Sequence, residues 1–412
     1  MRQQEVLESI LMRYQRIRAR SIELCARLET EDYVIQPYPE VSPPKWHLAH
    51  TTWFFENFIL KSYIDRYQVY NPYFDELFNS YYKSCGKHWL QAQRGILSRP
   101  TVADVLQYRH HVDEKMAMLL EDMEVETTPL YTLADVGLHH EQQHQELLLM
   151  DIKSIFSVNL SQPAYDNTPY KRVAAKSPDN WVEIDAGLYT VGAQSEGFAY
   201  DNERPAHQYY LPAFSIAENF VTNGEYLKFI EDNGYASPLL WLSDGWNWAM
   251  EQSINAPLYW SCQDGQWQEF TLHGTVPLDR DAPVCHISYY EADAFARWRG
   301  LRLPREQELE VYLLLSQKPD FPQPDEVWHP SYSYLYAKQL WAWSQTAYHP
   351  YPGFHSYEGA LGEYNAKFMC NQYVLRGGAF ATPREHYRPT YRNFYYPHQR
   401  WMFSGISLVK DL

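Results

Sequence analysis

Two histidines four residues apart are the side chains of this chain best suited to chemistry. His140 and His144 lie in a polar segment with a helical pattern. This spacing places both imidazoles on one helix face, about one turn apart, so that one metal ion can contact both rings. The alternative is a solvated pair on a polar surface. The apolar run at 147–150 indicates that part of the helix is buried, which favours a metal site.

A third ligand is expected near residue 50, because two imidazoles rarely hold a metal ion alone. His47 and His50 lie three residues apart on another predicted helix, and the spacing leaves either of them open as the ligand. Three neutral histidines on one side of a metal ion would leave further positions free for substrates. Three histidines alone do not distinguish iron from zinc.

A four-helix bundle is the element that would bring these histidines together. From residue 5 to about 155, apolar residues recur at spacings of three and four, which predicts helices. Bundles build metal sites from side chains of facing helices, and the histidines fall on the second and fourth segments. The predicted helices cover residues 4–29, 44–67, 101–123 and 131–156.

Two of these segments carry matching start signals. Thr101 is followed by Asp104, and Thr132 is followed by Asp135. A threonine side chain can cap free backbone amides, and an acid in the first turn favours the positive end of the helix dipole. These pairs predict where the third and fourth helices begin.

The composition changes after the bundle. Short alternating segments, frequent Gly and Pro, and dense Trp and Tyr predict a mixed α+β domain. We therefore expect a helical domain at 1–160, a linker at 161–182 and a loop-rich domain at 183–412. Within the last domain, short helices are expected at 289–299 and from Pro304.

Charge and composition exclude several classes of partner. The 412 residues carry a formal net charge of -16, which argues against nucleic acid and anionic membranes and favours small-molecule substrates. No apolar stretch is long enough to span a membrane and the start does not resemble a signal peptide, so we expect a cytoplasmic protein. The five cysteines lack CxxC spacing, which suits reduced thiols.

Several motifs in the second half, taken in order, resemble the formylglycine-generating-enzyme (sulfatase-modifying factor) fold, whose scaffold also occurs in lectin-like domains. The catalytic cysteine pair of those enzymes is expected after the last motif, where this chain reads Ala-Phe-Ala-Thr-Pro without cysteine, so formylglycine formation is excluded. The matching motifs are residues 201–205, 221–226, 302–310, 341–343 and 375–378.

The first half resembles a DinB-like bundle, and the two domains in this order resemble the ergothioneine-pathway sulfoxide synthases. The family signature HxxxHxE is matched by His140, His144 and Glu146, and its WHxxHxxWFFE segment by residues 46–56. The resemblance implies that His50 is the third ligand rather than His47. Glu146 lies about 200° around the helix from His144, so we expect a structural role for it.

The resemblance implies an iron(II) and O2-dependent enzyme that joins a thiol, cysteine or γ-glutamylcysteine, to C2 of the imidazole of hercynine and yields a sulfoxide. Hercynine is the trimethylated betaine of histidine. The related ovothiol-pathway enzymes act on histidine itself and usually carry an extra methyltransferase domain. We expect none here, since the chain ends at Leu412.

The resemblance also implies roles for individual side chains. Gln143 matches the glutamine that orients the substrate imidazole, and Arg94 an arginine that holds the carboxylate of the thiol. Reduction of O2 needs a proton or hydrogen-atom donor, a role that phenols suit. The segment Phe-Asn-Ser-Tyr-Tyr matches the tyrosine segment of the cysteine-using branch, so we favour Tyr82 as the catalytic residue, then Tyr81.

A second set of expected substrate-binding residues lies near the C-terminus. The segment containing Asn393 resembles the one whose Asn helps to hold the betaine. A quaternary ammonium has no hydrogen to donate, so its recognition needs aromatic faces. Phe394, Tyr395 and Trp401 are the nearby candidates.

One departure from the family leaves the donor open. Gln91 stands where related synthases tend to have an arginine three residues before Arg94. The change would remove a charge-assisted pair that contributes roughly 1.5 to 3 kcal/mol. A neutral donor becomes more credible, as in the selenoneine-forming relatives, which join a selenosugar to hercynine through a selenol.

Two other classes of function stay open. A zinc-dependent hydrolase or thiol transferase would use the same histidines without O2. A non-catalytic binding protein would use the lectin-like scaffold alone. Oxygen dependence and the effect of His140→Ala on ligand binding distinguish these alternatives from an oxygen-dependent synthase.

Overall fold

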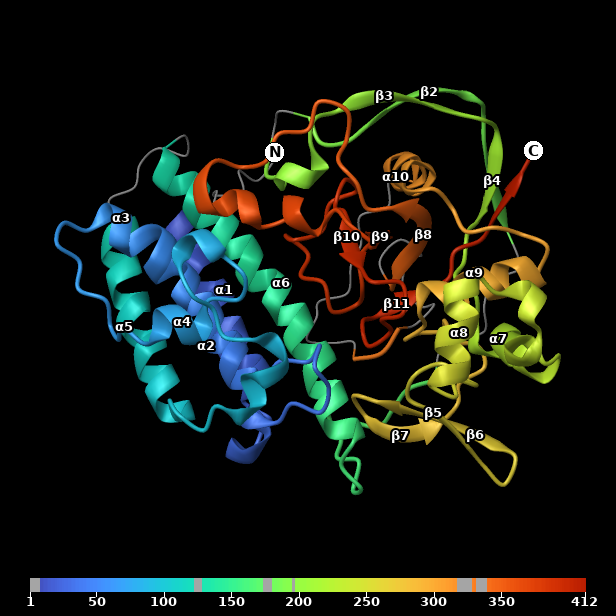
Figure 1. The fold of residues 1–412 in the computed structure, drawn as a ribbon, viewed down its shortest axis with the longest axis horizontal. Helices are drawn as coiled ribbons and strands as arrows, with labels where there is room; N and C mark the ends of the chain where they lie inside the picture. Colours follow the sequence, from blue (N-terminus) through green and yellow to red (C-terminus); the bar gives the residue numbers. More distant parts are fainter. Residues whose placement is uncertain (1–7, 122–127, 173–179, 195–196, 317–327, 331–338) are drawn as a thin grey trace, which may run out of the picture. The chain divides into compact units, whose positions relative to one another are not determined.

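The chain is described by a computed structural model, shown in Figure 1, and it divides into two compact parts. We call Met1–Val158 unit 1 and Asn159–Leu412 unit 2. The described residues are 8–121, 128–172, 180–194, 197–316, 328–330 and 339–412.

Unit 1 is a bundle of four long helices with shorter helical turns between them, which confirms the predicted fold of this part (Figure 1). α1 packs against α6, and α2 packs against both α5 and α6. The ends of the predicted segments at 4–7 and 122–123 lie outside the described residues. The helices are α1 (Ile10–Cys25), α2 (Pro44–Phe55), α3 (Lys61–Tyr63), α4 (Phe74–Phe78), α5 (Val102–Leu120) and α6 (Pro129–Ser157).

The start of α5 is as predicted, whereas the predicted start of α6 is wrong. Thr101 caps α5, where its Oγ1 accepts from the backbone N–H of Asp104. α6 begins one turn earlier than expected, with Thr128 as its cap and Pro129 at its first position. Proline fits this position because its missing N–H would have no partner there. Thr132 is therefore already inside the helix.

α2 is enclosed on all sides, since every residue from Pro44 to Phe55 is buried. It continues into a π-helical turn at Glu56–Leu60, a widening that is frequent at functional sites. The buried Glu56 carboxylate accepts from the hydroxyls of Tyr108, at 2.5 Å, and Tyr67, at 2.8 Å. These bonds fix the end of the helix that carries His50.

Unit 2 contains four small sheets and four helices among its described residues, the mixed α+β fold that was predicted. Their orders are β1-β4-β12, β10-β9-β8-β11, β2-β3 and β5-β6-β7. The strands are β1 (Trp181–Ile184), β2 (Gly187–Val191), β3 (His207–Leu211), β4 (Phe214–Ala217), β5 (Trp260–Gln263), β6 (Gln266–Thr271), β7 (Gly274–Pro277), β8 (Trp341–Ala347), β9 (Tyr373–Gly377), β10 (Asn393–Tyr395), β11 (Ser404–Gly405) and β12 (Val409–Asp411).

Two helices of unit 2, α9 and α10, lie where they were predicted, near residues 289 and 304, whereas α7 and α8 were not predicted. α10 contacts β8 and β9, as Figure 1 shows. Described parts of the expected linker at 161–182 belong to unit 2, where the Asp166 amide donates to the Leu272 carbonyl at 2.9 Å. The helices are α7 (Asn223–Glu231), α8 (Ser243–Glu251), α9 (Tyr289–Trp298) and α10 (Glu306–Leu315).

Two further features of the structure concern the cysteines and the lengths of the helices. All five cysteines are free thiols. Over the described ranges, no helix is both long and apolar enough to cross a bilayer.

Candidate metal centre

Three histidines of unit 1 converge on one point. His50 comes from α2, and His140 and His144 come from one turn of α6. Each offers a ring nitrogen, and these three nitrogens all lie within 4.8 Å of one another. The Nε2 atoms of His50 and His140 are 3.2 Å apart. His47, the other candidate, does not belong to this group.

The hydrogen bond of His50 determines which of its nitrogens faces the centre. Its Nδ1 lies 2.6 Å from the backbone carbonyl oxygen of Phe78, which can only accept. The network therefore assigns the proton to Nδ1, and Nε2 keeps its lone pair. The backbone thus prepares His50 as a ligand.

Burial keeps the three imidazoles neutral. It lowers the pKa of His140 to about 3 and the pKa of His50 well below its ordinary value. The pKa of His144 is lowered by burial and then by the neighbouring His140 and His50. Neutral imidazoles with free lone pairs are the form that binds metal ions, so the donor set fits a divalent metal such as iron or zinc.

A stack of flat groups lies beside His50. The Trp46 ring stacks on His50, with centroids 4.5 Å apart and an interplanar angle of 10°. The Arg94 guanidinium lies over Trp46, 3.3 Å from the ring centroid. Its Nη1 donates to the Ser42 hydroxyl at 2.7 Å. The predicted residue Arg94 is thus separated from His50 by one indole ring.

Arg94 is a buried cation without an acidic partner. Its exposed fraction is 6%, and burial lowers its pKa to about 9. In the described parts of the chain, no carboxylate lies within ion-pair distance of its guanidinium. Buried charges are normally paired, so this guanidinium is suited to bind an anionic group.

The predicted tyrosines lie near His50 through another aromatic ring, that of Trp53. Tyr82 is fully buried against Trp53, with centroids 5.7 Å apart, and Trp53 in turn stacks near His50 at 5.8 Å. Tyr81 is half-buried, and its ring lies 4.7 Å from the ring of Tyr82. A series of ring contacts therefore connects Tyr81 and Tyr82 through Trp53 to His50.

The remaining predicted residues of unit 1 occupy different environments. Gln143 is half-buried on α6 between His140 and His144, and Glu146 is buried but lies outside the histidine cluster. Gln91 is exposed, and its amide Nε2 donates to the backbone carbonyl of Glu40 at 2.8 Å. Its side chain contributes no charge near Arg94.

The predicted residues of unit 2 belong to β10 or lie beside it. Asn393 and Tyr395 share one face of this strand because side chains alternate along it, and the Trp401 ring lies 5.5 Å from Tyr395 at 82°. Phe394 points to the other face, where its ring stacks on Tyr348 at 4.2 Å. This contact gives Phe394 a packing role, and its predicted binding role stays a prediction.

Two residues behind the cluster were not expected from the sequence to support a ligand. His47 Nδ1 lies 2.8 Å from His144 Nδ1, and His47 Nε2 lies 2.8 Å from Asp151 Oδ2. The signal was present as spacing, because Asp151 follows His144 by seven residues and thus lies on the same helix face. Spacing alone does not tell which ring nitrogens meet.

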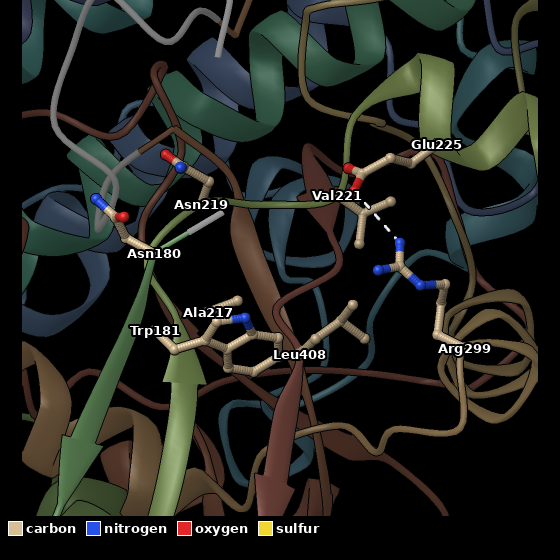
Figure 2. Close-up of a pocket in the computed structure, with 8 residues that line it drawn as sticks. All are labelled: Asn180, Trp181, Ala217, Asn219, Val221, Glu225, Arg299 and Leu408. Carbon is tan, nitrogen blue, oxygen red and sulfur yellow. Dashed lines mark hydrogen bonds and ion pairs between the residues drawn. The ribbon is translucent and has the colours of Figure 1, made fainter. Parts of the chain in front are cut away.

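Unit 2 also has a small pocket, shown in Figure 2, that contains none of the predicted site residues. Arg299 and Glu225 form an ion pair of 3.3 Å at one side of it. It therefore gives no support to the predicted chemistry. The pocket is lined by Asn180, Trp181, Ala217, Asn219, Val221, Glu225, Arg299 and Leu408.

Two family models match the two parts of the chain. The model of the DinB superfamily matches residues 13–148, which include all three histidines of the cluster. The model of the sulfatase-modifying factor enzyme 1-like domain matches residues 167–318. Both confirm the resemblances inferred from the motifs.

Two of the similar proteins are hercynine oxygenases, and a third is named for ergothioneine biosynthesis. The hercynine oxygenase of Mycolicibacterium smegmatis is 30% identical over 411 residues, which cover 91% of this chain and 92% of the relative. That of Mycobacterium tuberculosis is 30% identical over 67% of this chain and 70% of its own. Ergothioneine biosynthesis protein 1 of Schizosaccharomyces pombe is 29% identical over 60% of this chain but only 33% of its own length. The chain therefore belongs to the hercynine oxygenase family and is an oxidoreductase.

Proposed function

We propose that the protein is a non-heme iron(II) sulfoxide synthase of ergothioneine biosynthesis, which uses O2 to join a thiol to C2 of the hercynine imidazole. The observation that carries this proposal is the group of three neutral histidines, two buried and one half-buried, with ring nitrogens within 4.8 Å of one another. The names of the relatives support the substrate.

The reaction balances with O2 as the oxidant. The C2–H bond of hercynine and the S–H bond of the thiol break, and one C–S bond forms. One oxygen atom remains on sulfur, and the other leaves as water with the two hydrogens. Iron(II) bound by the histidines would supply the open positions at which substrates and O2 meet.

The protein's own residues would bind, orient and protonate. Gln143 would orient the hercynine imidazole, and Asn393, Phe394 and Trp401 would contribute to binding of the betaine. Tyr82 would donate the proton or hydrogen atom that O2 reduction requires, with Tyr81 as the second candidate. The ring contacts from Tyr82 through Trp53 to His50 support this assignment.

Arg94 supports a donor that carries a carboxylate, such as cysteine or γ-glutamylcysteine. Its buried guanidinium has Nη1 bonded to Ser42 and no acidic partner among the described side chains. A donor carboxylate could accept two parallel hydrogen bonds from such a group.

Gln91 supports a second candidate, a selenoneine synthase that takes a neutral selenosugar, because the second arginine of the family is missing. An ovothiol-type synthase acting on histidine is a further alternative, to be separated by comparing histidine with hercynine as substrate.

The test is anaerobic loading with iron(II), followed by O2 and hercynine with cysteine, γ-glutamylcysteine or a selenosugar in parallel, with products identified by mass. A sulfoxide adduct with a thiol is expected, whereas product only with the selenosugar would identify the selenoneine reaction. His144→Phe should abolish turnover. His139→Phe is the control, because His139 lies on the same helix as His144 but interacts with Arg13 and Asp135.

The outcomes separate the other classes. Turnover without O2 would indicate zinc chemistry instead. Absence of any product with iron(II), O2 and every donor would contradict the proposal.

A further inference from the structure

His47 joins a metal ligand to a buried carboxylate. It lies on α2 three residues before His50, and both its ring nitrogens are engaged. Nδ1 meets His144 Nδ1 at 2.8 Å, and Nε2 meets Asp151 Oδ2 at 2.8 Å. Exposed fractions of 4% for His47 and 3% for Asp151 keep water from competing for these bonds.

The carboxylate of Asp151 determines which atom donates in each hydrogen bond from Asp151 through His47 to His144. An ionised carboxylate only accepts, so the proton of His47 belongs on Nε2. A neutral His47 then has a bare Nδ1, which accepts from Nδ1–H of His144. This leaves His144 Nε2 without a proton and with its lone pair free.

We propose that Asp151 and His47 form a relay of positioning residues that fixes the tautomer and the ring orientation of His144, so that its Nε2 is ready to bind the metal. The proposal deepens the metal site of the proposed function and rests on it. Partners of this kind orient metal-binding imidazoles and make them more basic.

The fold holds both ends of the relay. Asp151 follows His144 by seven residues on α6, which places both on the same helix face. The same Asp151 Oδ2 also accepts from the backbone N–H of Ser42 at 2.8 Å. The relay therefore connects α2, α6 and the segment before α2 behind the histidine cluster.

The two helices prepare their ligands in different ways. His50 is oriented by a backbone carbonyl, that of Phe78, which no side-chain substitution removes. His144 depends on side chains alone for the bond at its Nδ1. Its readiness can therefore be altered by substitution without changing any ligand.

Metal affinity is the first readout of the test. Zn(II) alone and Fe(II) alone are titrated into the full-length protein against a competing chelator. His47→Phe, which keeps a flat ring but removes the acceptor, is expected to weaken binding about 10- to 100-fold. His47→Gln is expected to restore most of the affinity, since its amide oxygen can accept from His144 Nδ1–H.

Two further variants separate a relay from general damage. Asp151→Leu should also weaken binding, and the double variant with His47→Phe should weaken it no further, because both act through His144. His139→Phe is the control and should bind within about twofold of the unaltered protein, since this equally buried histidine lies outside the relay.

The tautomer is read directly in the metal-free protein labelled with 15N-histidine, where His144→Phe identifies the signals of His144. Nδ1–H is expected in the unaltered protein and a mixture in His47→Phe. An Nε2–H tautomer in the unaltered protein, or unaltered metal affinity in His47→Phe, would overturn the relay. If metal binding and tautomer are as expected but no adduct forms, the proposed function fails while the relay stands.

Discussion

Tyr82, the residue proposed as the proton donor, is shielded from water. Its ring is fully buried between Trp53 and Phe58, with centroids 5.7 and 5.1 Å away. Tyr81 beside it is only half-buried. Exclusion of water from a proton donor prevents proton leakage and other side reactions.

We therefore predict that Tyr82→Phe lowers formation of the sulfoxide adduct by about 100- to 10,000-fold, the usual contribution of a positioned proton donor. Oxidation of the thiol without coupling is expected to take its place. Product ratios measured by mass under limiting O2 test this, with Tyr81→Phe as the comparison. Unchanged ratios in Tyr82→Phe would assign the proton transfer to another group.

Gln91 is the residue that should decide the preference for donors. It is exposed and donates to the Glu40 carbonyl, one turn before the buried Arg94. Gln91→Arg would add a second cation for a donor carboxylate, and a hydrogen bond to a charged group contributes about 1.5 to 3 kcal/mol.

Gln91→Arg is therefore expected to raise kcat/KM for cysteine by about 10- to 100-fold over kcat/KM for a neutral selenosugar. Gln93→Arg adds the same charge two residues away at an exposed position and serves as the control. Equal effects of both substitutions on the two donors would mean that residue 91 does not contact the donor.

At the level of residues, the three-histidine cluster could be predicted from the sequence. The hydrogen bonds that hold one of its histidines from behind could not. The spacing of His140 and His144 gave one helix face, and the family motif selected His50 over His47. The hydrogen bonds that connect His47 to His144 and Asp151 depend on how α2 is rotated against α6. Spacing within each helix contains no information on that rotation.

At the level of elements, one buried carboxylate joins the helices of the bundle. Glu141 follows His140 on α6 and accepts from Arg109 of α5 at 2.6 Å and from Arg18 of α1 at 2.9 Å. Arg18 in turn donates to Thr52 of α2 at 3.0 Å. Burial alone would raise the pKa of Glu141, but the two guanidinium groups lower it to about 2.

Glu141→Gln should therefore destabilise the bundle by about 3 to 5 kcal/mol, because it leaves the buried Arg109 without its counter-charge and Arg18 with Asp113 alone. Hydrogen exchange of the metal-free protein, followed by mass spectrometry on peptides of α1, α5 and α6, measures this for unit 1 alone. Glu8→Gln removes the partner of the exposed Arg16 and should cost about 1 kcal/mol or less. A similar small loss for Glu141→Gln would show that the network contributes little.

Helix positions were predictable because the apolar pattern is strong, whereas the start of α6 was not. Thr128 and Thr132 are both possible caps, four residues apart. The acid after Thr132 favoured the later start, but Pro129 suits a first helical position and the helix begins there. The orders of the small sheets in unit 2 depend on contacts distant in sequence, which local patterns do not specify.

At the scale of the whole molecule, unit 2 buries ion pairs of its own. Glu306 of α10 accepts from Arg392 through both carboxylate oxygens, at 2.8 and 2.9 Å, and all these groups are buried. Burial raises the pKa of Glu306, but the charges of Arg392 and Arg376 outweigh it, so the net pKa lies below the ordinary value of 4.5.

This pair makes the stability of unit 2 depend on pH. In the unfolded chain Glu306 takes up a proton near pH 4.5, whereas in the folded chain it does so only at lower pH. Between these values the unfolded state binds more protons, so the free energy of unfolding falls as the pH falls, by up to about 1.4 kcal/mol per pH unit for one group. Glu306→Gln should lower stability at neutral pH and remove this part of the slope.

Hydrogen exchange of peptides from α10 and β9, corrected for the intrinsic pH dependence of exchange, reports unit 2 separately from unit 1. Glu251→Gln, at an exposed position of α8, should change the exchange free energy by no more than about 0.5 kcal/mol. An unaltered slope in Glu306→Gln would mean that other carboxylates determine the acid sensitivity of this unit.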